Sequence, residues 1–95
     1  MIRYKATRLD GTDFRTGRVL YEVGGTVTHP MAHRDDASGY LSVSTVPTDC
    51  TGMSWPCRLF EVEPVDEWTP SNGLSLPNKR ACHELRVIRE LPATD

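Results

Sequence analysis

The chain has 95 residues, of which 38% are hydrophobic and 25% charged, and its formal net charge is -2 at pH 7. A chain of this length closes one hydrophobic core, so we expect a single domain over residues 1–95. The composition excludes disordered, collagenous and coiled-coil chains, and no uncharged stretch approaches the roughly 18 apolar residues of a membrane span. A sequence pI near 5.9 disfavours general nucleic-acid binding. The first residues lack the apolar run of a signal peptide, so we expect a cytoplasmic protein that binds neither membrane nor nucleic acid.

The first third of the chain predicts two strands. Seven glycines and seven prolines place turn signals at short intervals, and the segments between them favour β-structure. Residues 2–7 alternate in polarity and lead into the Asp10-Gly11 turn, as a half-buried strand does. Residues 18–23 and 26–29 predict a second strand, interrupted at Gly24-Gly25 where a bulge is expected.

The rest of the chain predicts two or three further strands. Residues 40–46 are dense in β-branched side chains, and residues 57–63 alternate between apolar and acidic positions until Pro64 ends their hydrogen bonding. Residues 85–91 fit strand spacing slightly better than helical spacing. If the first and last segments pair, their arginines form a basic stripe or simply a solvated face.

The predicted fold class is therefore α+β, mainly β, with four or five short, mostly antiparallel strands and one or two short helices. A helical turn is expected within residues 47–55, where Pro47 suits a first helical position and Gly52 stops the helix early. Residues 81–84 are predicted as a turn or a second short helix. Long loops are expected at residues 30–38 and 64–79.

The cysteines and histidines predict no metal site. Three cysteines are an odd number, so we expect reduced thiols rather than a disulfide scaffold. His29 and His33 add nitrogen ligands, but the chain has no Cys-x2-4-Cys knuckle of the kind that binds zinc. Cys82 and His83 are adjacent, and on a strand they point to opposite faces, which disfavours a thiol–imidazole pair.

Two tryptophan-containing segments predict a protein-binding surface. Trp55, with Met53 beside it, and Trp68 stand close to prolines in segments that do not suit central strands. Tryptophan is enriched among the residues that anchor interfaces. Because the same rings also suit the core of a small domain, a core role is the alternative for each of them.

Several short phrases resemble a family of small uncharacterised proteins carried by bacteriophages and some bacteria. The phrases are Tyr4-Lys5-Ala6, residues 21–26, Gly39-Tyr40, residues 58–63 and residues 85–91. The chain lacks the Gly-Phe-His-x-Cys phrase found in many members and has Gly39-Tyr40-Leu41-Ser42 instead. The resemblance implies an origin in a phage of actinobacteria rather than a particular reaction.

A second pattern is similar to that of ADP-ribosyltransferases. In that family an arginine on the first strand holds the pyrophosphate of NAD, a hydroxyl-rich strand shapes the nicotinamide pocket, and a glutamate stabilises the positive charge that develops on the ribose. Arg3, Ser44, Glu61 and Glu63 occur here in that order. The alternating hydroxyls and carboxylates are equally typical of a half-exposed strand.

These observations lead to one main prediction and two alternatives. The main prediction is a small phage-encoded accessory protein that binds a host or phage protein, without catalysis and without a cofactor. Its binding residues are Met53, Trp55 and Trp68. One alternative is a minimal NAD-dependent enzyme similar to ADP-ribosyltransferases, and the other is a minor structural or oligomeric phage protein.

Overall fold

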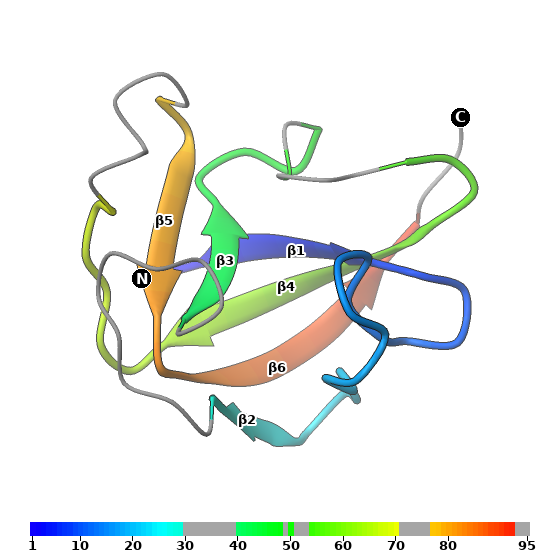
Figure 1. Ribbon diagram of the computed structural model, residues 1–95, viewed down its shortest axis with the longest axis horizontal. Coiled ribbons are helices and arrows are strands. Elements are labelled where there is room, and N and C mark those ends of the chain that lie inside the picture. Colours follow the sequence, from blue (N-terminus) through cyan, green and yellow to red (C-terminus); the bar gives the residue numbers. More distant parts are fainter. Residues whose placement is uncertain (30–39, 49, 51–53, 71–76, 93–95) are drawn as a thin grey trace.

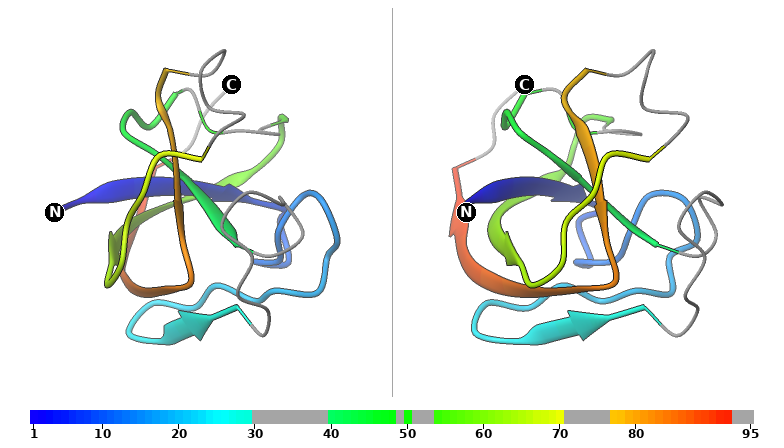
Figure 2. Two further views of the ribbon diagram at one scale, coloured as in Figure 1. Left: turned by 60° about the vertical axis from the view of Figure 1, so that its left-hand side comes forward. Right: turned by 90° about the vertical axis from the view of Figure 1, so that its left-hand side faces the viewer.

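A computed structural model describes residues 1–29, 40–48, 50, 54–70 and 77–92. The strands are β1 (Arg3–Thr7), β2 (Thr26–Thr28), β3 (Leu41–Ser44), β4 (Arg58–Pro64), β5 (Lys79–Cys82) and β6 (Glu84–Leu91). They form one antiparallel sheet in the order β2-β6-β4-β1-β3-β5. The sheet curls strongly, so that the molecule resembles a half-barrel (Figure 1; Figure 2).

The fold is all-β, and the prediction of an α+β fold with short helices is wrong. The described residues contain no helix, and consequently none long and apolar enough to cross a membrane. Residues 81 and 82 belong to β5 and residue 84 to β6, with a bend at His83, because residues 79–82 pair along the whole length of β3. The helical spacing of a few apolar residues is outweighed by the backbone hydrogen bonds that a neighbouring strand offers. In the segment expected to hold a helical turn, residues 47 and 48 form a turn.

The curl of the sheet arises where β5 passes into β6. Only His83 separates the two strands, yet β5 pairs with β3 at one edge of the sheet while β6 pairs with β4 and β2. The segment that follows β4 continues to pair with this bent ribbon beyond Pro64. The N–H of Val65 donates to the Glu84 carbonyl (2.9 Å), and Trp68 pairs with Ala81. The expectation that Pro64 ends the hydrogen bonding of its strand is therefore wrong. Residues 79–91 thus form one bent ribbon, of which β5 lies at one edge of the sheet and β6 lies next to the other edge.

The strands expected from the sequence at residues 2–7, 40–46, 57–63 and 85–91 are present, with slightly different ends. Residues 18–23 do not form the expected strand, since their only ladder contact is the isolated bridge between Thr12 and Leu20. The first and last segments do not pair either, because β4 lies between β1 and β6.

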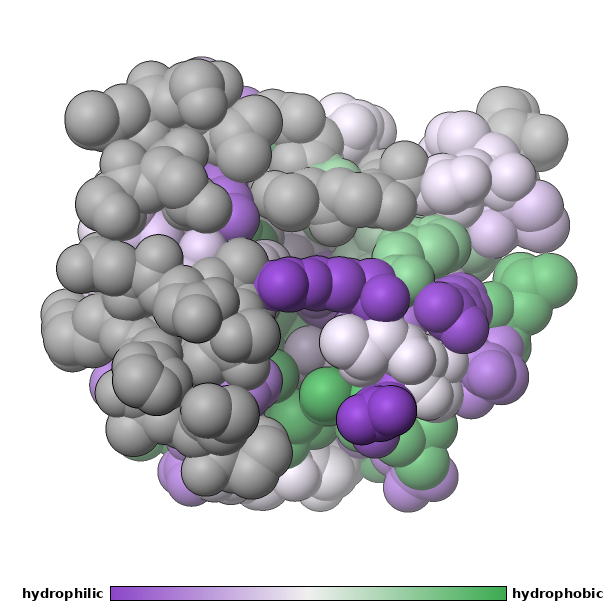
Figure 3. Space-filling model, viewed as in Figure 1, coloured by the Kyte–Doolittle hydropathy of each residue, from purple (hydrophilic) through white to green (hydrophobic). Residues whose placement is uncertain are grey.

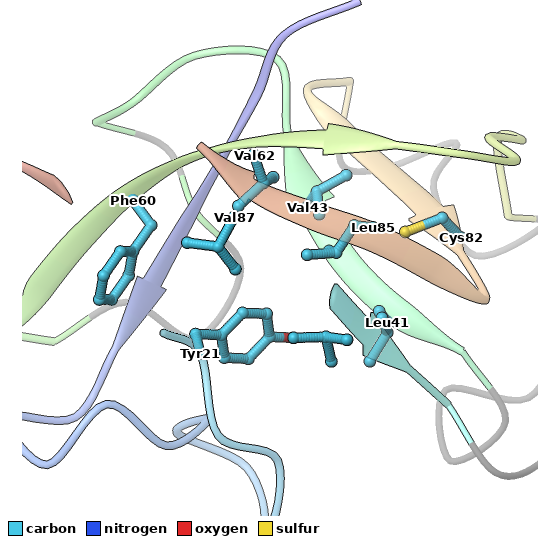
Figure 4. Packing of buried hydrophobic residues seen from close by; sticks show 9 residues of the cluster. Tyr21, Leu41, Val43, Phe60, Val62, Cys82, Leu85 and Val87 are labelled. Carbon is cyan, nitrogen blue, oxygen red and sulfur yellow. The ribbon is translucent and has the colours of Figure 1, made fainter. Parts of the chain in front are cut away.

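The main core fills the concave face of the sheet (Figure 4). It comprises Tyr21, Val27, Leu41, Val43, Phe60, Val62, Cys82, Leu85 and Val87. Tyr21 comes from the loop after β1 and covers this face with 1% of its surface exposed. Burial raises the pKa of its hydroxyl. Val19 packs against the same cluster, so the segment that follows β1 covers part of the concave face.

Candidate functional site

Two loops leave the sheet at one end, which we call the Thr7 end. Thr7 and Arg58 form the last pair of the β1–β4 ladder. Residues 8–21 follow this pair and residues 54–57 precede it, so the two loops begin side by side, on the right in Figure 1. The pairing of Leu59 with Leu91 brings the end of β6 to the same place.

Residues 8–21 form a compact loop because tight turns close it. The N–H of Gly11 donates to the carbonyl of Arg8 (2.9 Å), which places Leu9 and Asp10 at the tip of a turn. Gly11 has φ of 87°, a conformation that favours glycine. The N–H of Tyr21 donates to the carbonyl of Gly11 (2.8 Å), so the loop returns to its starting point as it delivers the ring of Tyr21 to the core.

Asp13 holds the middle of this loop together. Its carboxylate accepts hydrogen bonds from the backbone N–H groups of Thr16, Arg18 and Val19 at 2.9–3.1 Å, and from the hydroxyl of Thr16. Burial raises the pKa of Asp13, but these hydrogen bonds outweigh burial, and the pKa is lowered overall. The carboxylate therefore acts as a structural anion that rigidifies the loop.

Three large apolar side chains are exposed at the Thr7 end. Leu9 is 62% exposed, Leu20 49% and Trp55 42%. A Cβ atom added to Gly11 would lie 3.3 Å from Leu20 Cδ1 and 3.2 Å from Arg58 Nη1, so these two side chains meet above Gly11.

Charged side chains stand among these apolar ones. Arg58 forms an ion pair with Glu90 (2.8 Å). In the view of Figure 3 hydrophilic and hydrophobic residues lie side by side over this part of the surface. Among these side chains the tryptophan is the type enriched in the residues that anchor protein interfaces.

Other exposed apolar side chains are more dispersed. Met1 and Val65 lie at the opposite end of the sheet, where β1 begins and β4 ends. Ile88 belongs to β6, and Val23 lies beside that strand. The Thr7 end differs from these places because it holds a tryptophan.

Trp68 does not share a surface with Trp55. Trp55 precedes β4 and Trp68 follows it, so they lie at opposite ends of a seven-residue strand, a span of about 23 Å. The ring of Trp68 packs against Tyr40 (ring centroids 5.9 Å apart) and His83 (4.6 Å), and its backbone pairs with Ala81. Trp68 is thus a half-buried structural residue. Met53, the third predicted binding residue, lies outside the described residues.

Asp66 fixes the corner at which β5 becomes β6. Its Oδ1 accepts hydrogen bonds from the backbone N–H groups of His83 (3.0 Å) and Glu84 (3.2 Å), and its Oδ2 lies 3.2 Å from His83 Nδ1. The Nε2 atom of His83 is buried without a hydrogen-bond partner. The aspartate thus satisfies two backbone donors that the bend takes out of the ladder.

The residues of the predicted transferase site are divided between the two faces of the sheet. Tyr4 pairs with Ser44 on one side and with Glu61 on the other, which places all three side chains on the convex face. Glu63 lies two residues beyond Glu61 on the same face. Arg3 pairs with Val62 and so points to the concave side.

The ion pairs of these residues separate them further. Arg3 Nε donates to Glu67 (2.6 Å), and Glu61 accepts a hydrogen bond from Arg89. Glu63 lies 3.8 Å from the N-terminal nitrogen. The structure therefore brings Ser44 and Glu61 into one row across the sheet but does not bring Arg3 to them.

The three thiols are buried, and their surroundings do not favour the thiolate form that a nucleophilic cysteine needs. All three cysteines are free and buried. Burial raises the pKa of Cys57 and raises that of Cys82 to about 12, whereas a nucleophilic cysteine needs a lowered pKa. Among the described residues no group of three His, Cys, Asp or Glu side chains stands close enough to hold a metal ion, and His33 lies outside them.

Sequence reasoning missed Leu9, Leu20 and Asp66. Leu9 stands in the Arg8-to-Gly11 turn, and an apolar residue at a turn tip was a usable signal. Leu20 was expected in a strand, and Asp66 in an irregular loop.

Comparison with protein-family models, with curated proteins and with solved structures gives no match. A functional proposal therefore depends on the geometry of this chain alone.

Proposed function

We propose that this protein is a small binding module that docks a partner protein at the Thr7 end and catalyses no reaction of its own. The observation that carries the proposal is the exposure of Trp55 together with Leu9 and Leu20 where β1 and β6 end and β4 begins. A domain of 95 residues has few large side chains for its core, so leaving a tryptophan exposed removes packing that would otherwise stabilise the fold.

The build of the loop supports a preformed docking surface. Residues 8–21 are held by the turn at Gly11 and by the hydrogen bonds to Asp13, so Leu9 and Leu20 project from an ordered segment. A surface that is ordered before binding loses less conformational entropy when the partner docks.

The enzymatic alternative has less support. Arg3 and Ser44 project from opposite faces of the sheet, and the carboxylate of Glu61 is engaged by Arg89. The structural alternative is a minor structural or oligomeric phage protein, and no particular contact among the described residues favours it. Measuring the size of the protein in solution tests this alternative, because a monomer would count against it.

Affinity capture from a bacterial lysate tests the proposal. The tagged full chain is compared with Leu9→Ala/Leu20→Ala, Trp55→Ala and the control Val65→Ala, which shortens an exposed apolar side chain at the opposite end. We expect capture of one partner by the wild type and the control and its loss in the other two, with unchanged circular dichroism. Capture that survives in folded Trp55→Ala and in the double variant overturns the proposal.

A parallel sample with labelled NAD addresses the alternative. Transfer of label to lysate proteins that is lost in Glu61→Gln would make the protein an enzyme and would contradict a purely binding role.

A further inference from the structure

The loop that supplies the docking surface also gathers arginines that no acidic side chain pairs with. Arg8, Arg15 and Arg18 are exposed, and they lie within the blue loop on the right of Figure 1. None of these three guanidinium groups forms an ion pair with a carboxylate of the described residues. Three other arginines, by contrast, each pair with a glutamate, namely Arg3, Arg58 and Arg89. The loop therefore presents positive charge that is free to meet a partner.

Arg8 is held in place by a neutral acceptor. Its Nη2 donates to the carbonyl of Phe14 (2.9 Å), and its guanidinium lies against Gly17, where an added Cβ atom would come within 2.6 Å of Nη1. A carbonyl orients the guanidinium without cancelling its charge. The other N–H groups of Arg8 are thus positioned to donate to a carboxylate from outside the chain.

The two aspartates of the loop are engaged by groups other than arginines. Asp13 is buried and accepts hydrogen bonds from backbone N–H groups and from the hydroxyl of Thr16. Asp10 accepts from the N–H and the hydroxyl of Thr12, and these bonds, more than the nearby Arg8, lower its pKa. Both carboxylates reduce the net charge of the loop, but neither occupies a guanidinium group.

Arg18 projects to the same side of the loop as an exposed leucine. Val19 packs against the core and Tyr21 is buried in it, whereas Arg18 and Leu20 are exposed. This segment bridges to the first part of the loop as a strand does, and side chains two residues apart in a strand point to one side. Positive charge and apolar surface are therefore presented together.

We infer that the partner that docks at the Thr7 end presents acidic side chains beside apolar ones. This inference rests on the proposed function and adds the chemistry of the partner to it. Arginine forms paired N–H···O hydrogen bonds with carboxylates, and complementary charge across an interface selects the partner and speeds its approach. Leu9, Leu20 and Trp55 meet the apolar side chains of the same acidic segment.

The phosphates of nucleic acids are the other anions that arginines bind. An acidic protein fits this surface better, because two of its three exposed apolar residues, Leu9 and Leu20, are aliphatic and offer no ring on which a base can stack. The sequence pI near 5.9 also disfavours nucleic-acid binding. Binding of single-stranded nucleic acid is therefore an outcome that the test has to separate.

Selection of short random peptides displayed on phage tests the inference before the partner is identified. The immobilised full chain is the target, and peptides that also bind Trp55→Ala or Leu9→Ala/Leu20→Ala are removed. We expect the remaining peptides to be enriched in Asp and Glu together with apolar residues, relative to the starting library. Remaining peptides without acidic enrichment would overturn the inference and leave docking at the Thr7 end supported. If no peptide depends on the two leucines and the tryptophan, the docking surface fails and the inference fails with it.

Fluorescence anisotropy then measures the affinity of the most enriched peptide, used as a labelled synthetic probe. The variant Arg15→Gln/Arg18→Gln removes two charges from the loop and keeps the hydrogen bond of Arg8. We expect it to bind at least about fivefold more weakly than wild type. The matched control Arg80→Gln/Arg86→Gln removes two positive charges outside the loop, in β5 and β6, and should bind within about twofold of wild type. Circular dichroism checks that both variants are folded.

Salt separates a charge effect from lost packing. Raising NaCl to about 0.5 M should weaken peptide binding more for wild type than for Arg15→Gln/Arg18→Gln, because screening removes an attraction that the variant already lacks. Equal affinities of this variant and the control, or a wild-type affinity that does not change with salt, would overturn the inference. Tighter binding of a labelled oligothymidylate than of the peptide would assign the arginines to phosphate groups and would overturn it as well.

Discussion

The corner between β5 and β6 makes a quantitative prediction for Asp66. Replacing it by alanine removes the acceptor of two backbone N–H groups, those of His83 and Glu84. Each hydrogen bond to a charged group contributes about 1.5 kcal/mol or more, and the site is only partly buried, so we expect Asp66→Ala to lower the free energy of unfolding by about 2–3 kcal/mol. Asp66→Asn keeps one carbonyl oxygen as acceptor and should cost about 1 kcal/mol.

Urea unfolding followed by far-ultraviolet circular dichroism measures both variants. Glu67→Ala is the matched control, because it removes the neighbouring carboxylate, which pairs with Arg3 instead of with backbone groups, and it should cost less than about 1 kcal/mol. Amide hydrogen exchange adds a local test, since the amides of His83 and Glu84 should lose protection in Asp66→Ala. Equal stabilities of the alanine and asparagine variants, or unchanged exchange at these two amides, would refute the reasoning.

Three further predictions concern the loop and the core. The folded state lowers the pKa of Asp13, so the stability that its carboxylate contributes is complete above the ordinary pKa near 3.8 and is lost as the pH falls through the folded-state value. In urea unfolding, the stability difference between wild type and Asp13→Asn should therefore shrink from pH 7 to pH 2. Burial raises the pKa of Cys82 to about 12 in the folded protein, so its thiol should resist a disulfide reagent at pH 8 until the chain is unfolded. Rapid labelling in the folded state would contradict this. Gly17→Ala should destabilise the protein by more than Gly24→Ala. Both glycines have positive φ, but a Cβ on Gly17 would lie 2.6 Å from the guanidinium of Arg8 and displace it from its hydrogen bond to the carbonyl of Phe14, whereas nothing lies within 4 Å at Gly24; equal costs in urea unfolding would count against a contribution from that hydrogen bond.

Local sequence patterns predicted the central strands well because those strands follow simple rules. The alternation in residues 57–63 places Phe60 and Val62 in the core, as it does in the structure. Residues 79–82 were not recognised as a strand, since their pairing depends on β3, almost forty residues earlier in the chain. Residues 18–23 have strand composition, but Tyr21 is drawn into the core by tertiary packing.

The candidate site was predictable only in part. Trp55 was identified because it stands near a proline in a segment that does not suit a central strand, and because tryptophan is enriched among interface anchors. The sequence could not separate it from Trp68, because the exposure of each ring depends on its neighbours in space. Trp68 packs against Tyr40 and His83, whereas Trp55 stands in a short surface loop. Arg3 and Ser44 were grouped by order along the chain, whereas the register of the sheet decides which face each occupies.

The fluorescence of Trp55 tests docking at the Thr7 end most directly. The chain has two tryptophans, so Trp68→Phe leaves Trp55 as the sole indole, and Trp55→Phe leaves Trp68 as the control. When the captured partner is added, or a tryptophan-free form of it, the account predicts a blue shift and weaker acrylamide quenching for Trp55 and no change for Trp68. Emission of Trp55 that stays fully quenchable in the saturated complex would contradict docking at this surface.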